Sequence, residues 1–235
     1  MIYVLGGFSP AIAGILMVYG TNDEETIRDY WRRIFDFKRI GARWYLPIVL
    51  LYPACILLSF AVSRTPLDLT PLSELLQNPA YFLTTAAFIF LVGPFSEEPG
   101  WRDYALDWLQ ARYSAGVSSL ILGGIWWAWH LPLLTVTGSF LNTTGTDPVF
   151  LTGYLVTVLL YSILFTWVYN NNRRSVMAVI LLHFSINLTS RIILVPAHVF
   201  AVAMFVLLAI VMAVVTYYGW GRLVRAEPST TSPAV

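Results

Sequence analysis

Apolar stretches long enough to cross a lipid bilayer dominate this sequence. A membrane-spanning helix needs roughly 20 apolar residues, because the hydrocarbon core is about 30 Å thick and each helical residue rises about 1.5 Å. Stretches that meet this requirement lie at residues 2–20, 44–63, 80–97, 117–136, 149–169, 175–195 and 199–220. The sequence therefore predicts an all-α, polytopic transmembrane bundle of about seven spans.

The composition agrees with this fold class. Of the 235 residues, 57% are hydrophobic and 11% are charged, a balance that is foreign to soluble domains of this length. The net charge is only +1, and the basic residues form no single patch. We therefore expect the lipid bilayer and no nucleic acid as a partner. Because no repeat or long linker interrupts the chain, residues 1–235 are expected to form a single integral membrane domain, with a short flexible tail at 227–235.

The Lys and Arg residues between the apolar stretches predict the orientation. Positive residues are retained on the cytoplasmic side of a membrane. Twelve of them fall on one side, in residues 28–43, 102–112, 173–174 and 222–225, whereas only Arg64 and Arg191 fall on the other. We therefore expect a multi-pass protein of a prokaryotic cell membrane, with its N-terminus outside and its C-terminus in the cytoplasm.

Two polar connections on the predicted cytoplasmic side have the pattern of amphipathic helices. In residues 22–43 and 101–113, apolar residues recur three or four positions apart among charged ones. This spacing predicts helices that lie on the membrane surface.

Glu97 and Glu98 stand at the end of an apolar stretch, and His130, His183 and Asn187 lie inside two others. An ionisable group at membrane depth is costly, so it marks a functional site by default. His183 and Asn187 are four residues apart and therefore share one face of a helix. These residues become candidates for a catalytic site.

The segment that follows the two glutamates adds two expectations. Arg102 is four residues after Glu98, the offset at which a guanidinium and a carboxylate pair on a helix, which leaves Glu97 without a local partner. Pro99 and Gly100 both weaken helical geometry, so we expect the backbone to kink or loosen there.

Three short motifs occur in order between residues 80 and 195, each in or near its own apolar stretch: Glu97-Glu98-x-x-x-Arg102, Trp126-x-x-x-His130 and His183-x-x-x-Asn187. Together they resemble the CPBP family of CAAX proteases and bacteriocin-processing proteins, also called the ABI family, which is related to the Ras-converting CAAX endoprotease. The second motif of this family usually begins with Phe, and we expect Trp126 to change packing more than chemistry. Family members often carry another hydrophobic segment ahead of the one that begins here at Met1.

The resemblance implies an intramembrane endopeptidase that hydrolyses a peptide bond near the C-terminus of a membrane-associated or prenylated, CAAX-type substrate. It implies that Glu97 and His130 activate a water molecule, whereas His183 and Asn187 form the oxyanion hole. Glu98, Arg102 and Trp126 are expected to support the site. No cofactor is expected, and the site is expected to open to the cytoplasmic side.

Two alternatives remain open, the first from the residues and the second from the resemblance. Glu97, His130 and His183 could bind zinc and leave a fourth position for water, as in a zinc-dependent metalloprotease, although the HExxH helix typical of such sites is absent. The second alternative is a non-catalytic membrane protein that confers bacteriocin immunity or acts in phage defence.

Overall fold

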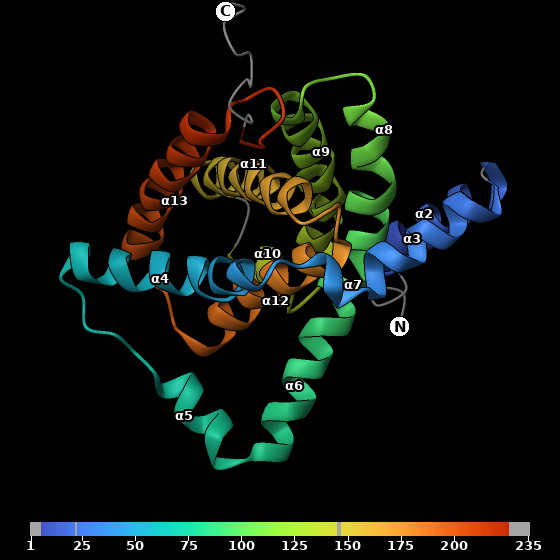
Figure 1. Ribbon diagram of the computed structural model, residues 1–235. Coiled ribbons are helices and arrows are strands. Elements are labelled where there is room, and N and C mark those ends of the chain that lie inside the picture. The colour runs from blue at the N-terminus through green and yellow to red at the C-terminus, as the bar shows by residue number, and fades with distance from the viewer. Residues whose placement is uncertain (1–5, 22, 145–146, 226–235) are drawn as a thin grey trace, which may run out of the picture.

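The computed structural model describes residues 6–21, 23–144 and 147–225, which contain helices and loops without any β-strand (Figure 1). The predicted tail at 227–235 lies outside these residues, and the single-domain organisation stays a prediction. In chain order the elements are α2 (Ser9–Thr21), α3 (Glu24–Phe35), η1 (Phe37–Arg39), η2 (Ala42–Trp44), α4 (Tyr45–Ser63), α5 (Thr70–Gln77), α6 (Pro79–Val92), α7 (Pro94–Glu98), η3 (Pro99–Ala105), α8 (Leu106–Gln110), α9 (Ala115–His130), η4 (Leu131–Thr135), α10 (Phe140–Thr144), α11 (Pro148–Asn171), α12 (Val176–Ile192) and α13 (Ala197–Tyr218).

The predicted transmembrane bundle is confirmed. Within the described residues, five helical stretches are long and apolar enough to cross a membrane, and two shorter apolar helices accompany them. In chain order these seven correspond to the seven predicted stretches. They are Ser9–Gly20, Ala42–Ser63, Pro79–Gln110, Ala115–Thr135, Pro148–Asn171, Val176–Ile192 and Ala197–Tyr218. The start of the first predicted span lies outside the described residues.

Side-chain caps fix where several helices of the bundle begin. The side chain of Ser114 accepts a hydrogen bond from the backbone N–H of Val117 at the start of α9. Asp147 and Ser175 cap α11 and α12 in the same way. Because Ser and Asp satisfy N–H groups that have no partner within the helix, they define the first turn. These caps fix the start of the helices that carry much of the candidate site.

The centre of the bundle is formed by α11, which packs along α9, α12 and α13, while α4 packs across α12 and α13 (Figure 1). Gly123 of α9 faces Ser162 of α11, and a Cβ at this glycine would lie 3.0 Å from the Cβ of Ser162. The absence of a side chain therefore lets the two helices approach closely.

The longest helical run extends from Pro79 to Gln110 and is broken twice. Gly93 and Pro94 separate α6 from α7, and the next break, η3, is a π-helical segment that begins at Pro99. The loosening predicted at Pro99 and Gly100 therefore takes the form of a wider helical turn, a feature that is common at functional sites.

The helix α2 packs directly on this π-helical segment. A Cβ on Gly100 would overlap the backbone carbonyl of Pro10, and a Cβ on Gly14 would lie 2.9 Å from the Cα of Gly100. Glycine at both positions allows the two backbones to touch. Gly100 thus serves the packing of α2 as well as the loosening of its own helix.

The prediction of two surface helices is wrong in one case and incomplete in the other. Residues 101–110 continue the long helix, and Arg102 and Asp103 are buried. Residues 22–43 divide into α3, η1 and η2, of which α3 buries Arg33. The physical reason is that the charges of the two segments pair with each other: Nε of Arg33 lies 2.9 Å from a carboxylate oxygen of Asp103.

A second contact fastens α3 to the broken helix. Burial raises the pKa of Tyr30 above its ordinary value, so its hydroxyl stays protonated, and it donates a hydrogen bond of 3.3 Å to the carbonyl of Pro99. Arg33 also donates to the hydroxyl of Tyr169 in α11, at 2.9 Å. Thus α3 belongs to the packed structure and anchors the segment that carries the two glutamates.

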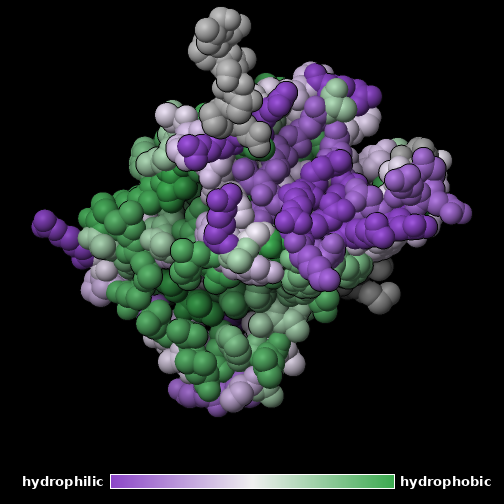
Figure 2. All heavy atoms as spheres, viewed as in Figure 1, coloured by the Kyte–Doolittle hydropathy of each residue, from purple (hydrophilic) through white to green (hydrophobic). Residues whose placement is uncertain are grey.

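The surface is divided by polarity. Figure 2 shows hydrophilic residues gathered over α3, α8 and the neighbouring loops, whereas hydrophobic residues cover the region of α4 and α6. An exposed hydrophobic surface of this extent suits an integral membrane protein surrounded by lipid. The direction of insertion stays a prediction.

Candidate active site

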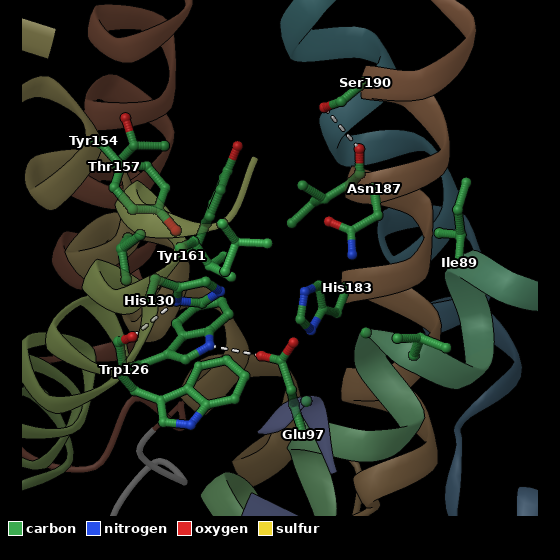
Figure 3. A pocket seen from close by; sticks show the side chains of 18 of the residues that line it. Ile89, Glu97, Trp126, His130, Tyr154, Thr157, Tyr161, His183, Asn187 and Ser190 are labelled. Atoms are coloured by element: carbon green, nitrogen blue, oxygen red, sulfur yellow. Dashed lines mark hydrogen bonds between the residues drawn. The ribbon is translucent and has the colours of Figure 1, made fainter. Parts of the chain in front are cut away.

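A cavity of about 1090 Å³ lies between α6, α7, α9, α11 and α12. Most of its wall is apolar or aromatic. Polar side chains converge in it from helices that are far apart in the sequence, as the close-up in Figure 3 shows. A large apolar cavity with a small number of convergent polar groups is the usual form of a binding or active site.

The four residues proposed to act on the substrate all line this cavity. Glu97 comes from α7, His130 from the end of α9, and His183 and Asn187 from one face of α12 (Figure 3). Of the three residues expected to support the site, Trp126 also lines the cavity. Glu98 and Arg102 do not line it and are completely buried behind it.

Glu97 has a partner that the sequence did not reveal. The indole N–H of Trp126 donates a hydrogen bond of 2.7 Å to Oε2 of Glu97, and both side chains are buried. A phenylalanine at this position could not donate such a bond, so Trp126 adds a polar contact to its packing role. That it changes packing more than chemistry stays a prediction.

The ring of His130 is oriented by its own helix. Nδ1 lies 2.8 Å from the carbonyl oxygen of Trp126, which can only accept, so Nδ1 carries the proton. In the neutral ring Nε2 is then an acceptor. The ring also lies edge-on to Trp129 and to Tyr154, with centroids 4.9 Å and 6.0 Å away. Tyr154 lines the cavity, and no motif in the sequence had singled it out.

His183 is held by Glu98. Nδ1 of His183 lies 2.7 Å from Oε1 of Glu98, and Nη1 of Arg102 lies 3.4 Å from Oε2 of the same carboxylate. The predicted pair of Glu98 and Arg102 is thus present and has His183 as a third member. Because Glu98 occupies Nδ1, the ring of His183 turns its other nitrogen, Nε2, to the cavity that it lines.

Aromatic rings enclose the charge of Arg102. Its guanidinium carbon lies 4.9 Å from the ring centroid of Trp126 and 4.9 Å from that of Phe165. The faces of aromatic rings attract cations, and this compensates part of the cost of burying the guanidinium. Trp126 therefore contacts the ion pair with its ring face and Glu97 with its N–H.

Asn187 approaches the break in the long helix. A Cβ on Gly93 would lie only 3.0 Å from Nδ2 of Asn187, which is closer than side chains normally pack. The glycine therefore makes room for the amide next to the cavity. A single glycine in an apolar stretch gives no signal by itself, so sequence reasoning did not identify Gly93.

The described residues contain no group of three His, Cys, Asp or Glu side chains arranged to hold a metal ion. Glu97, His130 and His183, the ligands of the zinc alternative, line one cavity without forming such a group.

The direction of the cavity bears on two predictions, the orientation of the chain and the cytoplasmic opening of the site. Along α12 the cavity continues from His183 through Asn187 to Arg191, away from the Arg-rich connection at 172–175. Along the long helix it continues from Glu97 of α7 back to Phe88 of α6. The helical run that contains Glu97 does not end there but continues to Gln110. The predicted orientation places the Arg191 end of α12 outside, so the predicted orientation and the predicted cytoplasmic opening do not agree with each other, and both stay predictions.

Comparison with known proteins connects this site to a family. Residues 79–189 match the family model described as type II CAAX prenyl endopeptidase Rce1-like. This segment is similar to the Rce1-like family. It runs from the start of α6 into the last part of α12 and includes every site residue proposed from the sequence. The resemblance stated from the three motifs is thereby confirmed.

A relative agrees with the Rce1-like match over a longer stretch. The chain is 28% identical over 222 residues to the protein named CAAX prenyl protease 2 from Methanococcus maripaludis, and the alignment covers 92% of this chain and 81% of the relative. The two matches together support intramembrane endopeptidase activity in an integral membrane protein.

Proposed function

We propose that this protein is a glutamate-dependent intramembrane endopeptidase that cleaves near the C-terminus of a prenylated or otherwise membrane-associated substrate. The observation that carries the proposal is the convergence of Glu97, His130, His183 and Asn187 on one large cavity with mainly apolar walls. The relative named CAAX prenyl protease 2 supports the substrate class, since CAAX sequences direct prenylation of a C-terminal cysteine.

Glu97 is the proposed general base. It removes a proton from a water molecule while the water oxygen attacks the carbonyl carbon of the scissile peptide bond. The neutral His130, with its proton on Nδ1, offers Nε2 as an acceptor that orients the water. The hydrogen bond from Trp126 holds the Glu97 carboxylate in place during this step.

The attack produces a tetrahedral oxyanion, which needs hydrogen-bond donors that are already in place. We assign this role to the side-chain amide of Asn187 and to Nε2 of His183, which face the cavity from adjacent turns of α12. Because Nδ1 of His183 is bonded to Glu98, Nε2 is the ring nitrogen left to donate to the oxyanion. Glu98 and Arg102 are positioning residues in this scheme.

Collapse of the intermediate completes the reaction. The carbon–nitrogen bond breaks, the proton taken up by Glu97 passes to the leaving amine, and a new carboxylate and a new amine are released. The apolar walls formed by Phe88, Ile89 and Phe150 suit a prenyl chain or apolar side chains of the substrate.

The test is cleavage of a quenched fluorescent prenylated peptide by the full chain purified in detergent. Glu97→Gln is expected to abolish cleavage, and Asn187→Ala to lower kcat by roughly 10²- to 10³-fold, the usual effect of losing one oxyanion donor. Glu74→Gln, which alters an exposed glutamate of α5 outside the cavity, is the matched control and should cleave like the wild type. Undiminished cleavage by a correctly folded Glu97→Gln protein would refute the mechanism.

A further inference from the structure

Arg191 is the one lysine or arginine among the described residues that line the cavity. It lies in the last turn of α12, is exposed, and comes two residues after the end of the Rce1-like match. No described carboxylate lies within ion-pair distance of it. By contrast, Arg33, Arg102 and Arg174 all pair with acidic residues.

The position of Arg191 along α12 gives its distance from the proposed catalytic residues of the same helix. His183, Asn187 and Arg191 follow one another at intervals of four residues, and all three line the cavity. At about 1.5 Å per residue, Arg191 lies roughly 12 Å beyond His183 and roughly 6 Å beyond Asn187 along the helix axis. An extended peptide covers about 3.3 to 3.6 Å per residue, so three residues span roughly 10 Å.

We propose that Arg191 binds the C-terminal carboxylate of the substrate and so places the scissile bond about three residues from the end of the chain. This inference rests on the proposed function and adds the group that selects the cleavage position. A guanidinium suits this task because its planar fork of N–H donors matches the two oxygens of a carboxylate.

The occupant follows from the chemistry of the cavity. Its wall offers apolar surface, the polar groups of the catalytic end and one cation at the far end. A substrate that fits has an apolar body and a single negative charge about three residues beyond the bond to be cut. The free C-terminus of a short apolar peptide segment has these properties without any acidic side chain.

The experiment compares three prenylated peptides of the same sequence. One ends in a free carboxylate, one in a carboxamide, and one is extended by three residues that end in a carboxylate. Wild-type kcat/KM is expected to be roughly 10- to 100-fold higher for the first peptide, the range typical of a hydrogen bond to a charged group. Because its carboxylate is displaced, the extended peptide should behave like the amide.

The variants separate this role from a structural one. Arg191→Gln should cleave the amide at the wild-type rate but lose most of the preference for the carboxylate, and Arg191→Lys should retain part of it. Arg64→Gln, which changes an exposed arginine outside the cavity, should retain the full preference. A purely structural effect, such as loss of a cation from the end of α12, would lower all three rates alike.

The outcomes also distinguish this inference from the proposed function. Equal cleavage of acid and amide by the wild type, or an undiminished preference in Arg191→Gln, would overturn the role of Arg191 and leave the endopeptidase standing. Failure of the wild type to cleave any of the three peptides would instead overturn the proposed function, and this inference with it.

Discussion

The indole N–H of Trp126 donates a 2.7 Å hydrogen bond to Oε2 of Glu97 and so joins α9 to the helix that carries both glutamates. The same indole ring lies over the guanidinium of Arg102, which pairs with Glu98. One aromatic side chain therefore connects the proposed base with the buried ion pair behind it.

Trp126→Phe, a change to the residue usual in the resembling family, should lower kcat/KM by about 10-fold, because a hydrogen bond to a charged group is worth about 1.5 to 3 kcal/mol. The ring remains, so the unfolding temperature should change little. Trp108→Phe, at an exposed tryptophan, is the control. Wild-type kinetics in Trp126→Phe would show that this bond does not contribute to catalysis.

Glu98→Gln should destabilise the protein, because it leaves the buried Arg102 without its counter-charge. Removal of one member of a buried ion pair typically costs about 3 to 5 kcal/mol. The measurement is thermal unfolding in detergent. The double variant Glu98→Gln/Arg102→Met, which removes both charges, should recover part of this loss. If both variants unfold at the wild-type temperature, the pair is not a stabilising element.

Gly100→Ala should strongly destabilise the packing of α2 on η3, since the added methyl group would overlap the carbonyl of Pro10. Backbone atoms cannot yield as a flexible side chain can. The matched control is Gly124→Ala in α9, where a Cβ meets nothing within 4 Å. That change should be neutral or stabilise by about 0.5 to 1 kcal/mol, because alanine suits a helix better. Equal unfolding temperatures for the two variants would contradict the close contact.

Chelation separates the glutamate mechanism from the zinc alternative. We expect cleavage of the prenylated peptide to survive incubation with a zinc chelator followed by dialysis, because Glu97 activates water without a metal in the proposed mechanism. The assay is repeated after zinc is added back. Activity that disappears on chelation and returns with zinc would make Glu97, His130 and His183 metal ligands.

Much of the fold could be predicted because it depends on local properties of the chain. The thickness of the bilayer sets the length of an apolar helix, and each of the seven predicted stretches has a counterpart in the structure. The spacing of four residues placed His183 and Asn187 on one face of α12, and paired Glu98 with Arg102. These relationships follow from helical geometry alone.

What the sequence by itself determined, then, was the set of helices, the three motifs and the local pairs within them. The tertiary structure decided that Trp126 holds Glu97, that Glu98 holds His183, and that the cavity runs toward Arg191. These contacts join helices that are distant in the chain, so they depend on how closely the helices pack. At Gly93 and Gly100 the absence of a side chain allows neighbouring groups to come close to the backbone. Local periodicity contains no information about such distances, because they arise only when separate helices meet.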